Sequence, residues 1–566
     1  MVSYRPAERK LDELFPEDRL FTMGPRRVLG DEECMASDWS DIDPAGRAST
    51  PVTRGEWRLL VVAAALAFIL GALNLAKPSL WHDELVHVFV AKSVATCGRA
   101  LLPSGDPIAS APLYHALLAP VVRLFGDGEF AMRFPSVLLA TVNVFLAFFT
   151  VRPLLGRATA LVTAFALALS PWSVAWSREA RFYTLQQTAY LCMILITQCL
   201  VTKRRASTLA ACGVGALCVY LCGIAISLHS VLFLAPLGTY AFLAFVSTRR
   251  IRSRWMLYGL AVGAIGAATM MGYYLFLPRA DSLAIFKEAG LGGTRVDPLR
   301  ASHLYYLDWL GRNLSVGFLA LALIGYAGMI IRERRRGLFA ALAFWAPVLC
   351  LSFLVSYRRP RFMYFAFPFY VAAFSYGLVM LCGFLPRMRR SWKHAAAGLL
   401  VLAFLGRLAV SAVYLVGDSV DAARGADTTL ARRHPQWREP CRYVRERLDP
   451  DTAVLTTTYL PVLYYVGRVD NWYPSKWLPQ EVGETGLEGL HDVAAIEAFV
   501  AEHPKGYFIA EWWRFDVVDV FPQIADDNAW VRANMTRIDE ASSKDVTVYA
   551  WGMADVSSPH HPAPEH

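Results

Sequence analysis

Long apolar stretches, separated by short polar connections, occupy most of the chain between residues 57 and 416. A helix that crosses a bilayer needs about 20 mostly apolar residues, and lipid obliges it to satisfy its backbone hydrogen bonds internally. The pattern therefore predicts a polytopic α-helical membrane protein with about 11 transmembrane helices. The predicted spans are 57–76, 134–151, 158–176, 183–201, 207–225, 226–246, 255–276, 314–331, 338–356, 362–384 and 395–416.

Basic residues cluster in every second connection, which is the positive-inside pattern of a chain whose N-terminus is cytosolic. The inner clusters are Arg152 and Arg157; Lys203, Arg204 and Arg205; Arg249, Arg250, Arg252 and Arg254; Arg332, Arg334, Arg335 and Arg336; and Arg387, Arg389, Arg390 and Lys393. We expect a multi-pass protein of the cell (inner or plasma) membrane. The segments predicted on its outer face are 77–133, 177–182, 277–313, 357–361 and everything after 416.

The first outer connection has helical periodicity of its own. Leu113, Leu117, Val121 and Leu124 recur at helical spacing, and a similar pattern begins at Leu85. This spacing predicts two amphipathic helices that lie along the membrane surface. The alternative is that their apolar faces pack on the helix bundle, and both interpretations predict an ordered loop.

The chain changes character at both ends of the predicted membrane module, 57–416. Residues 1–56 lack a sustained apolar period and predict a largely disordered cytosolic tail, and residues 554–566 predict a disordered tail whose histidines are solvated. Between the membrane module and the C-terminal tail, we expect residues 417–553 to form an extracytoplasmic α/β domain. Its expected strands are 452–459, 462–466, 507–511 and 546–551, and its expected helices are 441–448 and 493–503.

Composition narrows the function classes. The 566 residues are 55% hydrophobic with a mean hydropathy of +0.35, too apolar for one soluble domain. The formal net charge of +9 does not indicate nucleic-acid binding, because the basic residues lie mainly between apolar spans. The ten cysteines form no metal-spaced motif and no disulfide framework, and seven lie in or beside predicted spans.

Five arginines break the positive-inside pattern, because the topology puts them on the outer face. They are Arg178, Arg181, Arg358, Arg359 and Arg361, and Tyr183 follows the first pair closely. The planar guanidinium fork suits phosphate oxygens, so a phosphate-bearing ligand at this face would explain the breach. Pairing with lipid headgroups or with loop carboxylates is the alternative.

Asp83 and Glu84 follow the first span, in the tetrad 81–84. A carboxylate near the membrane surface can accept a proton from an attacking hydroxyl, so Asp83 is a candidate general base, with Glu84 in support. The alternative is an ordinary charge at a helix N-terminus. His82, His115 and His229 are candidate supporting residues without metal spacing. Arg407, within the last span, has no assigned role.

Several of these motifs together resemble a known family. The acidic pair after the first helix, the segment 111–114 (APLY), the segment 133–136 (RFPS) and the segment 178–183 (REARFY) occur in the order typical of GT-C glycosyltransferases. The chain is similar to their bacterial and archaeal branch, akin to protein O-mannosyltransferases and the aminoarabinose transferase of lipid A. Arg361 before the tenth span also resembles the family, whereas Phe362 stands where a tyrosine is frequent.

The resemblance implies a reaction. These enzymes transfer a sugar from a polyprenyl-phosphate-linked donor to a glycan, lipid or protein acceptor at the outer face, usually with inversion. By position, the family's catalytic acidic residue falls on Asp83, and its phosphate-contacting arginines fall on Arg178, Arg181 and Arg361. We also expect Arg358 to contact the phosphate. A metal bridging Asp83 and Glu84 is the alternative to a metal-free site, which we favour because the arginines already supply positive charge.

A transporter or flippase for polyprenyl-linked lipids is the alternative function. Such proteins place ionisable residues near the bilayer midplane and contain internal repeats. Here the candidate charges lie at the outer ends of spans, with His229 and Arg407 as exceptions, and no repeat is evident. This distribution favours an enzyme whose partners are a lipid-linked sugar, an acceptor and membrane lipids.

Overall fold

The computed structural model of the protein describes residues 51–202, 205–247, 253–276, 302–355, 358–383, 390–416, 435–473, 486–487, 489–515 and 525–553. All of them belong to one compact unit, Arg47–His566, whereas the other unit is Met1–Gly46. The predicted tail 554–566, nearly all of the tail 1–56 and most of the connection 277–313 lie outside the described residues.

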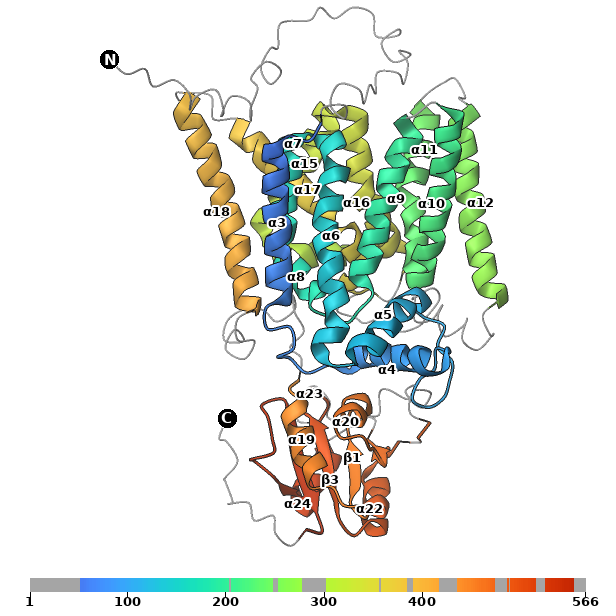
Figure 1. Ribbon diagram of the computed structural model, residues 1–566, viewed down its shortest axis with the longest axis vertical. Helices are drawn as coiled ribbons and strands as arrows, with labels where there is room; N and C mark the ends of the chain where they lie inside the picture. Colours follow the sequence, from blue (N-terminus) through green and yellow to red (C-terminus); the bar gives the residue numbers. More distant parts are fainter. Residues whose placement is uncertain are drawn as a thin grey trace, which may run out of the picture. The chain divides into compact units, whose positions relative to one another are not determined.

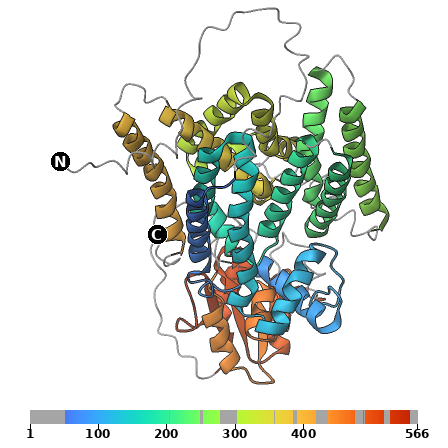
Figure 2. The same ribbon diagram turned by 45° about the horizontal axis from the view of Figure 1, so that its top comes forward.

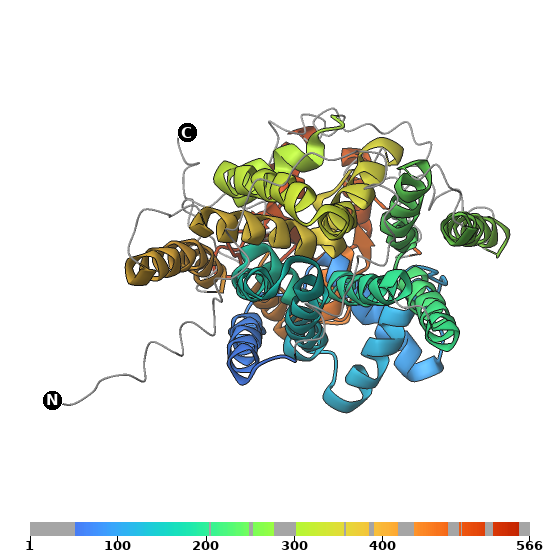
Figure 3. The ribbon, with the colours of Figure 1, turned by 90° about the horizontal axis from the view of Figure 1, so that it is seen from above.

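Long helices run side by side in a bundle, which Figure 1 shows from the side and Figure 3 shows end-on. The helices of the bundle and its connections are α3 (Arg54–Ala72), α6 (Glu129–Leu155), α7 (Arg157–Leu169), α8 (Pro171–Ser177), α9 (Tyr183–Thr202), α10 (Ala206–Ile226), η2 (Leu228–Leu234), α11 (Ala235–Ser247), α12 (Ser253–Phe276), α14 (Tyr305–Leu314), α15 (Val316–Arg332), α16 (Arg334–Leu354), η4 (Pro360–Ala366), α17 (Phe367–Gly383) and α18 (Arg390–Val416). Each of the eleven predicted spans coincides with one of these helices or with a consecutive pair.

Fewer helices than predicted meet a strict criterion for spanning. Within the part of the chain that the structure describes, six helices are long and apolar enough to cross a membrane, or up to seven if a bent pair is one span. That pair is α7 and α8, which meet at an angle of 57°. Four shorter apolar helices accompany them. The membrane-protein fold class is thus confirmed, while the count of eleven stays a prediction.

The predicted span 158–176 is broken at Ser170, where the chain enters α8. Pro171 is the first residue of that helix, a position that tolerates proline because its missing N–H would have no intrahelical partner. Two other predicted spans, 226–246 and 362–384, begin with the 3₁₀ segments η2 and η4. The segments η2 and η4 carry the candidate site residues His229 and Arg361.

Glycines allow α15 and α17 to pack backbone to backbone. A Cβ atom added at Gly325 would lie 1.9 Å from the Ala373 carbonyl oxygen, and one at Gly377 would lie 2.4 Å from that of Leu321. Small residues at such crossings are typical of membrane helices, whose association depends on close van der Waals contact. Larger side chains at these two positions would force the helices apart.

The first outer connection forms two helices, as predicted, which cross the end of the bundle in Figures 1 and 2. They are α4 (His82–Cys97) and α5 (Pro112–Phe125). Gly98, with φ of 72°, ends α4, and Ala111, with φ of 51°, precedes α5. Helix α5 buries Tyr114 and Leu118, whereas its last residue, Phe125, is exposed. The buried face packs against α4, α6 and α10.

The C-terminal region contains a five-stranded mixed sheet in the order β2-β1-β3-β5-β4. Strand β1 is parallel to β2 and β3, and β5 is antiparallel to β3 and β4. Apolar clusters cover both faces of the sheet, so its central strands are buried throughout. The elements are α19 (Arg438–Glu446), β1 (Ala453–Thr456), α20 (Tyr459–Tyr465), β2 (Asn471–Trp472), α22 (Val493–Glu502), β3 (Gly506–Glu511), α23 (Trp512–Phe515), α24 (Ala525–Asn534), β4 (Thr536–Arg537) and β5 (Val546–Trp551).

Most predicted elements of this region occur in the structure, but one is wrong. The segment 462–466, predicted as a strand, belongs to helix α20. The apolar residues of α20 pack on two different elements. Val462 and Tyr465 pack on the sheet, whereas Leu460 packs on α4. The short strands β2 and β4 and the helix α24 were not predicted from the sequence.

Candidate active site

The tetrad 81–84 forms the N-terminus of α4. Trp81 is the N-cap, and its backbone N–H donates to Oε2 of Glu84 over 3.3 Å. Carboxylates in the first turn stabilise a helix by accepting from unpaired N–H groups and by opposing its dipole. Because adjacent helical residues project about 100° apart, the side chains of Asp83 and Glu84 lie in different surroundings.

Glu84 faces inward and is completely buried. Arg133 of α6 donates two parallel hydrogen bonds to its carboxylate, from Nε over 2.8 Å and from Nη2 over 2.7 Å. The backbone N–H of Ala180 donates a third, over 2.7 Å. Glu84 therefore ties α4 to α6 and to the turn that carries Arg181.

Arg133 also holds the backbone that leads into the tetrad. Its remaining donors bond to the carbonyl oxygens of Leu75, Pro78 and Ser79 at 2.7–3.0 Å. The guanidinium is 1% exposed, so each of these donors is satisfied inside the protein. Although Arg133 lies in the recognised segment 133–136, the sequence assigned it no role, because its partners are backbone atoms and one distant carboxylate.

Asp83 lies on a different side of α4 and keeps about a quarter of its side chain exposed. Its Oδ2 atom is 2.5 Å from Nη1 of Arg181 and 3.1 Å from Nη1 of Arg361. These three residues come from the first connection, the turn before α9 and the segment η4. The structure thus brings together the predicted base and two of the predicted phosphate-binding arginines.

Aromatic rings fix the position of Arg181. Its Nη2 atom donates to the hydroxyl of Tyr183 over 3.2 Å, and its guanidinium lies 5.8 Å from the ring centroid of Trp81. Burial disfavours the charged guanidinium, but Asp83, Tyr183 and Glu179 outweigh this effect and raise the pKa of Arg181 above its usual value. Arg181 is therefore a permanent cation in a partly dehydrated place, which strengthens its attraction for an anion.

Arg178 lies at the end of α3 instead of beside Asp83. Its guanidinium donates to the last carbonyl oxygens of that helix and of the turn after it, those of Leu70, Gly71, Leu73 and Asn74. Such oxygens have no intrahelical partner, so a basic side chain that reaches them caps the helix. These contacts hold the Arg178 side chain at the end of α3, and its predicted phosphate contact stays a prediction.

Arg358 has a similar position at the end of α16. Its Nε and Nη2 atoms donate to the carbonyl oxygen of Ser352 over 3.1 and 2.7 Å, and Nη2 lies 3.2 Å from Nδ1 of His303. These contacts hold the guanidinium against the end of α16, and the predicted phosphate contact of Arg358 stays a prediction. Arg407 lies on the exposed side of α18, where it bonds to Ser411, one turn further along.

The three predicted supporting histidines lie in separate contacts. His82 packs edge-on against Tyr459 of α20, with ring centroids 5.8 Å apart. His229, in η2, stacks on Phe362 at 4.3 Å, so the residue that departs from the family pattern serves as an aromatic platform next to Arg361. His115 bonds to His87 of α4, a residue that the sequence analysis did not single out.

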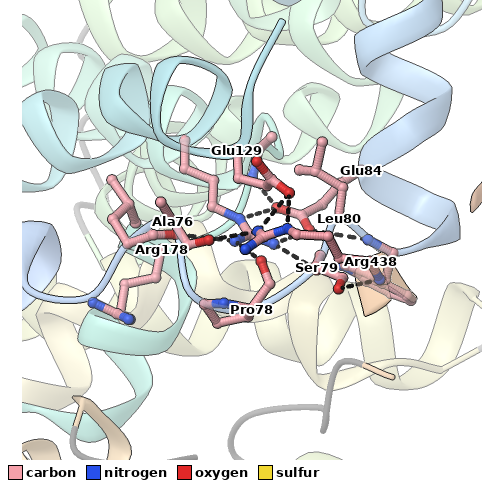
Figure 4. A network of polar contacts seen from close by, with 12 residues as sticks. Ala76, Pro78, Ser79, Leu80, Glu84, Glu129, Arg178 and Arg438 are labelled. Atoms are coloured by element: carbon pink, nitrogen blue, oxygen red, sulfur yellow. Dashed lines mark hydrogen bonds and ion pairs between the residues drawn. The ribbon is translucent and has the colours of Figure 1, made fainter. Parts of the chain in front are cut away.

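Residues of the C-terminal region form hydrogen bonds with the segment before the tetrad, as Figure 4 shows. Arg438 of α19 bonds to Glu129 of α6, at 2.5 Å, and its backbone N–H donates to Oγ of Ser79. The hydroxyl of Tyr465 accepts from the backbone N–H of Leu80 over 2.8 Å and donates to Glu129 over 2.9 Å. The start of α4 is therefore fixed from two sides, by Arg133 and by the α/β region.

The part of the chain that the structure describes contains no evident metal site. Among the described residues, no group of three or more His, Cys, Asp or Glu side chains could hold a metal ion. Of the tetrad, Glu84 would have to leave Arg133 to become a ligand, and Asp83 would have to leave two arginines. The expectation of a metal-free site stays a prediction.

Comparison with known proteins identifies the fold. Residues 109–273 match the family model of dolichyl-phosphate-mannose-protein mannosyltransferases. The chain is similar in structure to ArnT from Cupriavidus metallidurans bound to undecaprenyl phosphate, with a TM-score of 0.60, 14% identity, and coverage of 90% of this chain and 100% of that one. It is also similar to the oligosaccharyltransferase AglB from Archaeoglobus fulgidus in complex with an inhibitory peptide and a dolichol-phosphate, with a TM-score of 0.56, 12% identity, and coverage of 89% and 75%. No curated protein sequence matches the chain.

The chain is thus a multi-pass membrane protein with the fold of the GT-C glycosyltransferases, which confirms the resemblance seen in its motifs. Within that class, its segment 109–273 carries the pattern of the dolichyl-phosphate-mannose-protein mannosyltransferase family. This segment begins just before α5 and ends in α12, and it contains Arg133, Arg181 and His229.

Proposed function

We propose that the protein is a glycosyltransferase that moves a sugar from a polyprenyl-phosphate-linked donor to an acceptor at the outer face of the cell membrane. The observation that carries this proposal is the contact of Asp83 with both Arg181 and Arg361. It provides one proton acceptor and two cations at a single place. In support, the two relatives described above were solved with undecaprenyl phosphate and with a dolichol-phosphate.

The donor phosphate competes with Asp83 for the two arginines. The Asp83 carboxylate contacts both guanidinium groups, and a phosphate that presents two oxygens can replace it through the same N–H groups. Once an arginine turns to the phosphate, the carboxylate is available to an acceptor hydroxyl. Binding of the donor therefore prepares the base.

Transfer then needs one general base and no general acid. Asp83 accepts the proton of the acceptor hydroxyl while that oxygen attacks the anomeric carbon from the side opposite to the phosphate, so the configuration inverts. The bond between the anomeric carbon and the phosphate oxygen breaks, and its electron pair leaves with the phosphate. Arg181 and Arg361 stabilise the charge that develops there. A second carboxylate, as in many hydrolases, is unnecessary because phosphate leaves as a stable anion.

The acceptor, whether a glycan, a lipid or a protein, has to approach between the tetrad and the α/β region. The contact between His82 and Tyr459 puts α20 directly beside the tetrad. Residues carried on such a region can vary without disturbing the base, so we expect the α/β region, with the connection 277–313, to select the acceptor.

The decisive experiment measures cleavage of the donor. Purified protein in detergent is incubated with a panel of polyprenyl-phosphate hexoses and pentoses and with a membrane extract as the source of acceptor. We expect one donor to release polyprenyl phosphate in equal amount to the sugar that appears on the acceptor. Transport of an intact donor lipid across a vesicle membrane, without any release of polyprenyl phosphate, would establish the flippase alternative instead.

The two arginines Arg361 and Arg178 form a matched pair for a second test. We expect Arg361→Gln to lower the transfer rate by roughly 100-fold, because it removes one of two donors that stabilise the leaving phosphate, and to leave the melting temperature nearly unchanged. Arg178→Gln should instead lower the melting temperature by several degrees, since it leaves buried carbonyl oxygens of α3 unpaired. Equal effects of both variants on transfer per folded molecule would contradict the assignment.

A further inference from the structure

The parallel strands of the α/β region have a doubly wound arrangement. Strand β1 lies between β2 and β3 in the sheet, although it precedes both of them in the chain. Helix α20, between β1 and β2, packs on one face of the sheet through Val462, whereas α22, between β2 and β3, packs on the other face through Phe499. Sheets of this kind bind ligands outside the carboxyl ends of their strands, where successive connections leave on opposite faces. In this sheet that place is the carboxyl end of β1 and β3.

Polar side chains from both strands meet at this place. Glu511 is the last residue of β3 and is 6% exposed. The hydroxyl of Thr458 donates to Oε2 of Glu511 over 2.7 Å, and the backbone N–H of Glu511 donates to Oγ1 of Thr457 over 2.8 Å. These two hydrogen bonds fix the carboxylate against the turn that follows β1. Because a carboxylate can accept about four hydrogen bonds, Glu511 can bind a ligand hydroxyl while it keeps the bond from Thr458.

The carboxyl ends of the parallel strands lie beside the tetrad. Thr458 is the N-cap of α20, and the next residue, Tyr459, contacts His82 with ring centroids 5.8 Å apart. Trp472, the last residue of β2, packs against Tyr459 at 5.7 Å. His82 immediately precedes Asp83 in the first turn of α4. A molecule bound by Thr458 and its neighbours would therefore lie next to the proposed base.

An exposed tryptophan directly follows the buried carboxylate. Trp512 begins α23 at the carboxyl end of β3, and its side chain is 51% exposed. The backbone N–H of Trp512 donates to the carbonyl oxygen of Asp545 over 2.9 Å, so the position of the residue is fixed. A half-exposed indole loses much of the stabilisation that burial of so large a side chain provides. Its place, one residue after Glu511, makes it a candidate contact for a bound molecule.

A carboxylate and an indole at one place suit a glycan. The hydroxyl groups of a sugar donate charge-assisted hydrogen bonds to a carboxylate, and the C–H groups on one face of its ring pack on an indole. A peptide in extended form would instead pair with an edge strand of the sheet, which is β2 or β4. A lipid would need an apolar surface, whereas Thr457, Thr458 and Glu511 make this place polar. The chemistry therefore favours a glycan over a peptide or a lipid.

We propose that the acceptor is a glycan and that it binds at the carboxyl ends of β1 and β3, where Glu511 accepts hydrogen bonds from its hydroxyls and Trp512 packs on a sugar ring. This inference rests on the proposed transferase function and adds a substrate class and two binding residues to it. Neither residue takes part in bond making. The reacting hydroxyl gives its proton to Asp83 as its oxygen bonds to the anomeric carbon, and the electron pair of the broken bond leaves with the phosphate.

The test measures transfer to three acceptor preparations from one membrane extract: water-soluble oligosaccharides, peptides and lipids. We expect the oligosaccharides to accept the sugar. Glu511→Gln keeps an oxygen for Thr458 but removes the charge, and it should raise KM for the oligosaccharides roughly 10-fold. Trp512→Ala should raise it roughly 5- to 10-fold, and Trp512→Phe much less. KM for the donor and the melting temperature should not change. Glu502→Gln, at an exposed position near the opposite end of β3, is the matched control and should match the unmodified protein.

Several outcomes would overturn the proposal. Unchanged KM in folded Glu511→Gln and Trp512→Ala variants would remove the site and leave the transferase function intact. Transfer to peptides or lipids, and none to oligosaccharides, would remove the glycan assignment. If Glu511→Gln does not fold, Trp512→Ala decides, because its side chain is exposed. Titration calorimetry with the oligosaccharides tests the site even if no donor is cleaved: binding that Trp512→Ala weakens would support the site alone, and absence of binding would overturn it.

Discussion

Replacement of Asp83 by asparagine is expected to lower sugar transfer by roughly 1000-fold, the typical contribution of a positioned general base. Asparagine has nearly the same shape but cannot take a proton from the acceptor hydroxyl. Binding of polyprenyl phosphate should become tighter, because the variant leaves Arg181 and Arg361 without the carboxylate that competes with phosphate. Release of polyprenyl phosphate from the donor measures the rate, and titration with polyprenyl phosphate measures the affinity.

The matched control for this prediction is Asp106→Asn. Asp106 lies on the same connection and is exposed, and its carboxylate accepts a local hydrogen bond from the Ser104 hydroxyl. The same chemical change there should leave both the rate and the affinity as they are in the unmodified protein. Transfer by the Asp83→Asn variant at the unmodified rate would remove Asp83 from the mechanism.

Glu84→Ala is expected to have the largest effect on stability. It leaves the Arg133 guanidinium buried without a counter-charge, and breaking a buried pair in this way costs about 3–5 kcal/mol. The variant should accordingly melt far below the unmodified protein in detergent. Loss of the hydrogen bond from Ala180 should also loosen the turn that carries Arg181, so the folded fraction should transfer sugar more slowly.

An exposed ion pair of the same length provides the comparison. Arg312 and Asp308 are 2.7 Å apart, like Arg133 and Glu84, but their side chains are 75% and 50% exposed. Asp308→Ala should cost less than about 1 kcal/mol, because water already solvates both charges. Similar melting temperatures for Glu84→Ala and Asp308→Ala would show that burial of the Glu84 pair does not determine its contribution.

The apolar pattern predicts the helices of the bundle well because lipid leaves a long apolar segment no other stable conformation. It does not reveal breaks within such a segment, and at Ser170 the only signal is the proline that follows. The segment 462–466 shows the opposite limit, since five apolar residues are too few to distinguish a strand from a helix. Pro461, tolerated early in a helix but not in a central strand, was the available clue.

Charge placement locates the candidate site but does not tell which arginine faces it. The outer arginines Arg181 and Arg361 reach Asp83, while Arg178, only three residues before Arg181, reaches the end of α3. The topology predicts only on which side of the membrane an arginine lies. The unpaired carbonyl oxygens of a helix end can bind its guanidinium as readily as a phosphate can. Arg438 and Tyr465 had no detectable signal, because no sequence pattern joins them to the first connection.

The hydrogen bonds between the C-terminal region and the segment before the tetrad also determine when the candidate site is completed during synthesis. The hydrogen bond between Leu80 and Tyr465 joins residues 385 positions apart, and that between Ser79 and Arg438 joins residues 359 apart. At about 5–20 residues per second, roughly 20–80 s separate translation of the tetrad from translation of the residues that fix it. A nascent chain therefore completes its bundle before the tetrad is held in place, and the candidate site is complete only when the last region has folded.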